Sequence, residues 1–90
     1  MAKPHVLIYT RDFCGYCSAA KALLRAKGVE FEERNATANP DFRAEMMKVS
    51  GRNTFPQIYI GTTHVGGCDD LHELDDRGGL DPLLAGDRGA

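Results

Sequence analysis

The sequence has 90 residues, with 11 basic and 13 acidic side chains and a formal net charge of -2. This length predicts one domain over residues 1–90, with a core from about residue 5 to residue 84 and a loose carboxyl-terminal tail. The absence of a basic run and of tryptophan argues against nucleic acid as a partner. No secretory leader and no apolar span of membrane length are evident, so we expect a cytoplasmic protein without a membrane partner.

The first 35 residues predict a strand, a helix and a second strand. Residues 5–10 form an apolar run rich in β-branched and aromatic side chains, which is typical of a central strand covered on both faces. Alanine and leucine then recur at helical spacing over residues 15–27, and Gly28 ends this helix. Residues 29–35 begin with apolar and polar alternation and then become charged, which indicates an exposed strand at a sheet edge.

The next segment predicts a second helix, which ends at Ser50. Asn39 is the expected N-cap of this helix, and Pro40 lies in its first turn. An apolar stripe at helical spacing marks the face that we expect to lie on the core. The stripe consists of Phe42, Met46 and Val49.

The remainder of the chain predicts a hairpin and a covering helix. Residues 55–60 indicate a strand with a proline near its start, and a turn leads from it into a short antiparallel strand at residues 64–66. A glycine-led helix starts near Cys68, and a further helical turn is expected around residues 81–84. The order β-α-β-α-β-β-α predicts an α/β fold with a small mixed sheet and helices on both faces.

Three cysteines in a chain expected in the cytoplasm indicate chemistry or metal binding rather than a disulfide scaffold. Cys14 and Cys17 form a C-x-x-C pair where the first strand meets the first helix. The first turn of a helix carries unpaired N–H groups and a partial positive charge, which favour a thiolate, and Arg11 adds a cation nearby. Residues three apart share a helix face, close enough to form a disulfide. We therefore expect Cys14 to be an exposed nucleophile that ionises readily and Cys17 to be the inner, resolving thiol.

Three short motifs lie at the ends of the predicted elements. They are C-G-Y-C at residues 14–17, T-F-P-Q at residues 54–57 and G-G-C-D-D at residues 66–70. With these motifs in this order, the chain closely resembles the glutaredoxins, specifically the small bacterial dithiol type, from about residue 6 to residue 84. The resemblance implies a thioredoxin-like fold with a four-stranded mixed sheet, a cis peptide bond before Pro56, and a glutathione site where the three motifs converge.

The resemblance also implies which residues bind glutathione. The backbone of Phe55 would pair with the extended tripeptide, and Asp69 would accept a hydrogen bond from its γ-glutamyl ammonium group. Arg11, helped by Arg52, would pair with the glycyl carboxylate, and Tyr16 would flank the sulfur. The full implied set is Arg11, Tyr16, Arg52, Thr54, Phe55, Pro56, Gly67, Cys68 and Asp69.

The reaction implied by the resemblance is glutathione-dependent thiol–disulfide exchange. Cys14 attacks the glutathione sulfur of a protein–glutathione mixed disulfide, and a second glutathione then regenerates the thiolate. With a protein disulfide, Cys17 resolves the mixed disulfide instead. The implied partners are glutathione and glutathionylated or disulfide-containing proteins, and we expect the catalyst to be a monomer.

Two alternative functions stay open. Gly15 stands where many dithiol glutaredoxins have proline, and some relatives with a small residue there resemble dimeric scaffolds for a [2Fe–2S] cluster. Such a cluster would be held by the first cysteine of each protomer, Cys14 here, and by two glutathiones. A zinc-binding interaction module would use Cys14 and Cys17 as half of a four-ligand site, but the other candidate ligands show no second paired spacing. Those candidates are Cys68, His5, His64 and His72. Cys68 is interpreted equally well as a small residue at a helix start or as a redox thiol.

Overall fold

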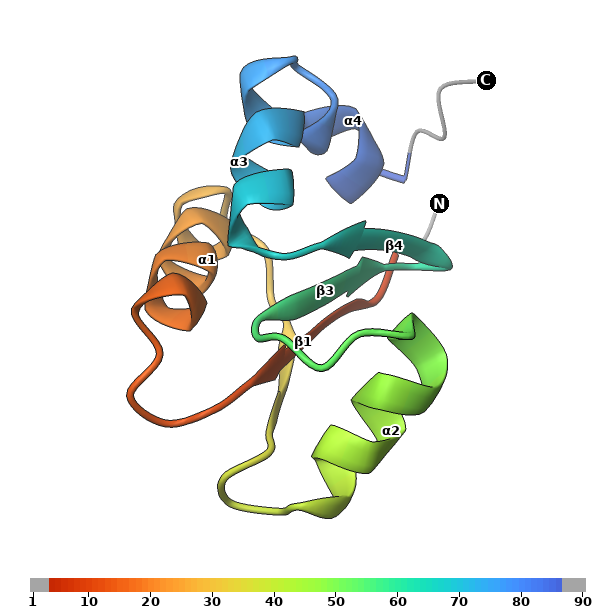
Figure 1. Ribbon diagram of the computed structural model, residues 1–90. Coiled ribbons are helices and arrows are strands. Elements are labelled where there is room, and N and C mark those ends of the chain that lie inside the picture. Colours follow the sequence, from red (N-terminus) through yellow and green to blue (C-terminus); the bar gives the residue numbers. More distant parts are fainter. Residues whose placement is uncertain (1–3, 87–90) are drawn as a thin grey trace.

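Four strands form one mixed sheet in the computed structural model, which describes residues 4–86 (Figure 1). In spatial order they are β2 (Glu32–Asn35), β1 (Val6–Thr10), β3 (Gln57–Ile60) and β4 (Thr63–Gly66). β1 pairs in parallel with β2 and antiparallel with β3, and β3 pairs antiparallel with β4. The expected central position of the first strand, edge position of the second strand and closing hairpin are therefore confirmed. Residues 87–90 of the expected tail lie outside the described residues.

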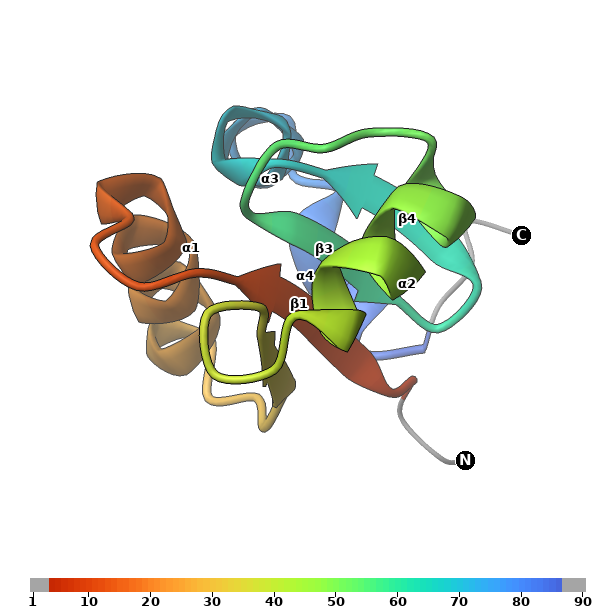
Figure 2. The same cartoon turned by 60° about the horizontal axis from the view of Figure 1, so that its bottom comes forward.

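Helices cover both faces of this sheet, as the order of elements predicts. They are α1 (Gly15–Ala26), α2 (Asp41–Ser50), α3 (Cys68–Asp76) and α4 (Leu80–Leu84). α1, α3 and α4 lie on one face, whereas α2 lies on the other and comes to the front when the molecule is turned (Figures 1 and 2). The short α4 corresponds to the helical turn expected near residues 81–84.

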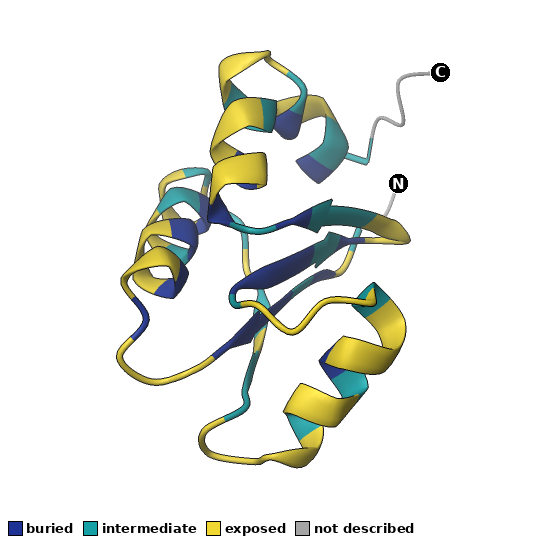
Figure 3. Cartoon of the chain, in the orientation of Figure 1, coloured by how far each residue is buried: buried dark blue, intermediate teal, exposed yellow. Residues whose placement is uncertain are grey.

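The main core lies between the sheet and the layer of α1, α3 and α4. Buried residues follow β1 and β3 and parts of these helices (Figure 3). Burial of one large aliphatic side chain contributes about 1.5–3 kcal/mol, so this cluster is a main source of stability in so short a chain. Its members are Val6, Ile8, Ala20, Leu24, Ile58, Ile60, Cys68, Leu71, Leu80 and Leu84. The core thereby fixes the end of the sheet at which β1 and β4 both finish and from which the two cysteine-bearing segments emerge.

Two strands begin later than the sequence predicts. β2 starts at Glu32 rather than at residue 29, because the Val29 N–H still donates to the Leu24 carbonyl of α1 at 3.4 Å as the chain leaves the helix. β3 starts at Gln57, opposite Tyr9 of β1, rather than at residue 55. Proline has no N–H to donate to a ladder, which suits a position just outside the strand.

The second helix also differs in detail from the expectation. α2 begins at Asp41 and its N-cap is Pro40, so the expected N-cap at Asn39 and the expected place of Pro40 in the first turn are each wrong by one position. The side-chain oxygen of Asn39 nevertheless accepts the Asp41 N–H at 3.1 Å. Met46 is fully buried, but Val49 is 56 % exposed, and its expected place on the core is wrong. Helical spacing defines a face of the helix, while the short contact of α2 with the sheet decides which part of that face is covered.

A hydrogen-bonded cluster fastens α2 to the sheet. The hydroxyl of Tyr9 in β1 donates to the carboxylate of Glu45 in α2, and Arg34 in β2 also binds Glu45. Arg34 donates in addition to Glu32 at 2.7 Å, and its guanidinium lies 5.8 Å from the centre of the Phe42 ring. Burial, together with the hydrogen bond to Glu45, raises the pKa of Tyr9 to about 12, so its hydroxyl stays protonated and able to donate.

Glu45→Gln is expected to lower the free energy of unfolding by about 1 kcal/mol at neutral pH, a modest value because the cluster is partly solvated. The hydrogen bond from Tyr9 and the bond from Arg34 hold the pKa of Glu45 below its ordinary value of 4.5. The carboxylate therefore stabilises the fold above that value, and its contribution is lost as the pH falls through the lower pKa of the folded state. Urea unfolding of both proteins at neutral pH and at about pH 3.5 measures this change.

Glu73→Gln is the matched control, because Glu73 is exposed on α3 and its ion pair with Arg77 spans 4.0 Å. A difference between wild type and Glu45→Gln that stays constant across this pH range would contradict the assignment.

Candidate active site

Cys14 occupies the N-cap of α1, at the corner where β1 passes into the helix. Its Sγ accepts the backbone N–H of Cys17 at 3.2 Å, and its carbonyl accepts the N–H of Ser18 at 3.1 Å. The sulfur is therefore held against the first turn of the helix, with a backbone N–H directed at it. The position that the sequence predicts for the C-x-x-C pair is confirmed.

The expected exposure of Cys14 is wrong. The residue is only 7 % exposed, against 2 % for Cys17. Its Sγ turns inward, toward the first turn of α1, and lies 4.0 Å from the carbonyl oxygen of Phe55. A disulfide that reaches this sulfur must therefore meet the residues around it as well.

Cys17 is the deeper of the two thiols. Burial, followed by its hydrogen bond with Cys14, raises the pKa of Cys17 to about 12. The thiol is therefore protonated at neutral pH and does not compete with Cys14 as the first nucleophile. All three cysteines of the chain are free thiols in this structure.

A groove of about 250 Å³ opens beside Cys14. All three motifs contribute to its walls, and Phe55, whose carbonyl faces Cys14, is one of its lining residues. The peptide bond between Phe55 and Pro56 is cis, as predicted. A Cβ on Gly67 would lie 3.4 Å from the Pro56 carbonyl oxygen, so the two backbone segments come close together in this wall. The lining residues are Tyr16, Arg52, Thr54, Phe55, Pro56, Gln57, Gly67, Cys68, Asp69 and Asp70.

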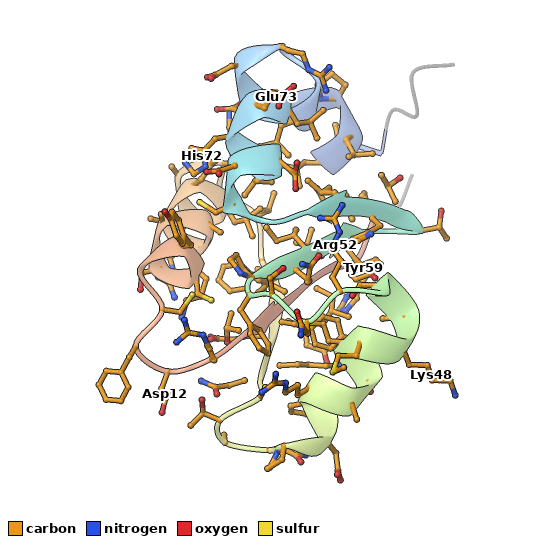
Figure 4. All side chains as sticks on the ribbon, viewed as in Figure 1. Asp12, Lys48, Arg52, Tyr59, His72 and Glu73 are labelled. Atoms are coloured by element: carbon orange, nitrogen blue, oxygen red, sulfur yellow. The ribbon has the colours of Figure 1, made fainter. Side chains whose placement is uncertain are left out.

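Opposite charges face each other across the groove. Arg52 comes from the loop that leads into β3 (Figure 4), and its Nη1 lies 3.6 Å from Oδ2 of Asp70 in α3. Asp69 is exposed in the first turn of the same helix. A guanidinium on one side, with carboxylates and the N-terminal N–H groups of a helix on the other, suits a peptide-like ligand that carries both charges.

Two groove residues were not predicted from the sequence. Asp70 accepts the Gly67 N–H at 2.9 Å and so caps α3, a role that its spacing of three residues from the N-cap could have revealed. Gln57 is buried, and its amide group donates to both Thr54 oxygens at 3.1 Å while its carbonyl oxygen meets His64 at 2.8 Å. Gln57 thereby links the loop before β3 to β4, through contacts that no capping or turn pattern in the sequence predicts.

Arg11 lies apart from the other predicted glutathione residues. It lines a separate hollow with Cys14 and Cys17, and its guanidinium donates to the carbonyls of Asp12 at 3.2 Å and Phe13 at 3.3 Å. The remaining eight predicted residues all line the groove. The pairing of Arg11 with a glycyl carboxylate stays a prediction.

Cys68 lies on the wall of the groove and is 7 % exposed. Its Sγ is 3.4 Å from Nδ1 of His72, which also contacts the Cys68 carbonyl at 2.9 Å. Burial, followed by the charges of Asp69 and Cys14, raises the pKa of the Cys68 thiol. A protonated, enclosed thiol favours the interpretation of Cys68 as a small wall residue over that of a second nucleophile.

Residues 4–86 contain no group of three or more histidine, cysteine, aspartate or glutamate side chains placed to hold a metal ion. Within the same residues, every helix is too short or too polar to cross a bilayer. Binding of a [2Fe–2S] cluster through Cys14 of two protomers stays a prediction, as does the monomeric state.

Comparison with known proteins places this site in a family. The glutaredoxin family model matches residues 6–65. The chain is 59 % identical over 80 residues to glutaredoxin 3 of Escherichia coli strain K12, which covers 89 % of this chain and 96 % of that protein. The solution structure of glutaredoxin from Brucella melitensis is 60 % identical, with a TM-score of 0.82 and coverage of 94 % of this chain and 92 % of that one. The crystal structure of the buckwheat glutaredoxin–glutathione complex is 30 % identical, with a TM-score of 0.83 and coverage of 90 % and 76 %. The chain therefore belongs to the glutaredoxin family, with the thioredoxin-like fold and the thiol–disulfide oxidoreductase activity of that family.

Proposed function

We propose that the protein uses glutathione to reduce protein–glutathione mixed disulfides and protein disulfides, with Cys14 as the nucleophile and Cys17 as the resolving thiol. One observation carries the proposal. The Sγ of Cys14 lies 4.0 Å from the carbonyl of Phe55, which lines a groove built from all three motifs. A ligand in that groove would thus hold its sulfur next to the nucleophile.

Glutathione fits the charges of this groove, because it is a tripeptide with two carboxylates and one ammonium group. One carboxylate would meet the first N–H groups of α3, and the ammonium group would meet Asp69 in the same turn. Arg52 would take the other carboxylate. Its present partner Asp70 is 3.6 Å away and both side chains are about half exposed, so this pair exchanges at little cost. The buckwheat relative, solved as a glutathione complex, supports the same choice of ligand.

In the proposed reaction, the Cys14 thiolate attacks the glutathione sulfur of a mixed disulfide. The old S–S bond breaks, the target leaves as a thiolate that takes up a proton, and Cys14 becomes bonded to glutathione. The thiolate of a second glutathione then attacks the bound glutathione sulfur, which gives glutathione disulfide and restores Cys14. With a protein disulfide, the Cys14 thiolate attacks one target sulfur and the other target sulfur leaves as a thiolate, which takes up a proton. Cys17 then loses its proton and attacks the Cys14 sulfur, which releases the second target thiol and leaves a disulfide between Cys14 and Cys17. Two glutathione molecules reduce this disulfide and leave as glutathione disulfide.

The proposed partners are therefore glutathione and proteins that carry glutathionylated cysteines or disulfides. A chain whose three cysteines are free thiols suits a reducing compartment, and we place its activity in the cytoplasm. Each step above needs one active site, so the proposed catalyst is a monomer.

Asp69→Asn is expected to raise the KM for a cysteine–glutathione mixed disulfide about tenfold and to change kcat less than about twofold. The substitution removes the charge that would hold the ammonium group while it leaves Cys14 untouched. Steady-state reduction of this substrate in the presence of glutathione measures both constants. Asp76→Asn, in the last turn of α3, is the matched control. An inactive wild-type protein would refute the proposed function, and an equal effect of the two substitutions would refute the role of Asp69.

A further inference from the structure

Phe13 has two properties that are unusual for a large apolar residue. Its side chain is fully exposed, with a relative accessibility of 101 %. Its φ is 57°, and within residues 4–86 no other residue except glycine has a positive φ. A bulky side chain disfavours this left-handed conformation, and such outliers gather at functional sites.

The backbone of this loop is held by other residues, not by the Phe13 ring. The Asp12 N–H donates to Thr37 Oγ1 at 3.0 Å, and the Asn35 side-chain amide donates to Asp12 Oδ1 at 2.9 Å. Arg11 donates to the Phe13 carbonyl at 3.3 Å. The fold thus fixes where Phe13 stands, while the ring itself buries no surface within the described residues.

Phe13 stands directly beside the nucleophile, on a different side from the groove. It lines the hollow that contains Arg11, Cys14 and Cys17, whereas Tyr16 lines the groove. Of the four large apolar side chains exposed in residues 4–86, two therefore flank Cys14, one on each side, and the other two are Met47 and Val49 of α2. Because Cys14 is only 7 % exposed, a partner protein must also place the residues beside its own disulfide against the surface around Cys14. Phe13 and Tyr16 are the large apolar side chains exposed on that surface.

We propose that Phe13 determines specificity for the protein partner, by contact of its ring with an apolar side chain next to the partner's disulfide. This inference rests on the proposed function, in which glutathione fills the groove. The target protein then lies on the other side of Cys14, over the hollow that Phe13 lines. If a leucine side chain of the partner buries part of the Phe13 ring, the partner is expected to react about five to ten times faster than one without an apolar side chain there.

The test uses two disulfide-linked peptide dimers that are identical except for leucine or serine beside each cysteine. Fully reduced protein reacts with each in a single turnover without glutathione. Cys14 attacks one peptide sulfur and releases one peptide thiol, and Cys17 then releases the other. We expect the wild-type protein to react about five to ten times faster with the leucine peptide. The Phe13→Asn variant is expected to react with both peptides at the rate that the wild-type protein shows with the serine peptide. Asparagine tolerates the left-handed backbone but supplies no ring.

Phe13→Tyr, which keeps the ring, and Val49→Ala, which removes apolar surface from α2, are both expected to keep the preference. If Phe13→Asn keeps the preference for the leucine peptide, the proposal is overturned. It is also overturned if Phe13→Asn slows both peptides and a small disulfide equally, because the substitution would then act on the reactivity of Cys14. Self-association of the wild type that Phe13→Asn abolishes in sedimentation would assign the ring to a contact between copies instead. Since no glutathione is present, these outcomes are independent of a failure of glutathione-dependent activity.

Discussion

Cys14→Ser is expected to lose thiol–disulfide exchange activity by about 1,000-fold or more with every substrate. A serine hydroxyl is not ionised at neutral pH and attacks sulfur poorly, so the first bond to the substrate does not form. Serine is also a good N-cap, and its oxygen can accept the Cys17 N–H as the sulfur does now. The fold is thus retained, and the loss is chemical. Rates with a small glutathione mixed disulfide and with a peptide disulfide measure the effect, and thermal unfolding verifies the fold.

Cys17→Ser is the informative partner of that variant. We expect it to keep most of its activity on the glutathione mixed disulfide, because a second glutathione can resolve the intermediate without Cys17. Its single-turnover reduction of a peptide disulfide should stop at the mixed disulfide with Cys14. Mass spectrometry of the trapped complex would identify that species. If Cys17→Ser loses both activities to the same extent as Cys14→Ser, the division of roles between the two thiols is wrong.

Gly66→Ala is expected to lower the free energy of unfolding by about 3 kcal/mol, a large part of the stability of a small domain. Gly66 has a φ of +115°, which other residues rarely adopt. An added Cβ would lie 2.3 Å from Oδ2 and 3.1 Å from Cβ of Asp70. The Asp70 carboxylate would have to move, and it would lose its bond to the Gly67 N–H and its pairing with Arg52. Urea unfolding gives the stability, and the KM for the mixed disulfide reports on the groove.

Gly78→Ala separates the cost of backbone strain at a positive φ from the cost of the clash with Asp70. Gly78 has a φ of +77°, but an added Cβ there meets nothing within 4 Å, so we expect a cost of only about 1 kcal/mol. A second control is Gly66→Ala combined with Asp70→Ala. Because the clash partner is then absent, the double variant should be more stable than the sum of the single effects predicts. Equal costs at Gly66 and Gly78, or strict additivity with Asp70→Ala, would contradict the clash.

The sequence predicts the arrangement of this protein well where one local pattern decides the outcome. The apolar run before Cys14 and the helical spacing after Cys17 place the thiols at a strand-to-helix corner, and the structure has them there. The same holds for the exposed edge strand, whose charged residues could not be buried between two neighbours.

Other features depend on contacts that no short pattern contains. Cys14 is nearly buried because its sulfur turns toward its own helix and the Phe55 carbonyl from another element. Arg11 was assigned to the groove by motif position, but two carbonyls of its own loop bind its guanidinium elsewhere. The capping role of Asp70 can be predicted from its spacing of three residues from Gly67, but its approach to Arg52 depends on how α3 sits against the loop before β3.

The charged edge strand β2 also affects how the protein behaves in concentrated solution. An open strand edge offers unpaired backbone groups to any passing chain, and edge-to-edge pairing is a common route to aggregation. Here the edge carries Glu32, Glu33 and Arg34. His5 lies within hydrogen-bond distance of Glu32 at 3.0 Å, and Lys21 forms an ion pair with Glu33 at 3.0 Å. A strand from another molecule would have to desolvate these charges before it could pair. Strand addition is therefore disfavoured along β2.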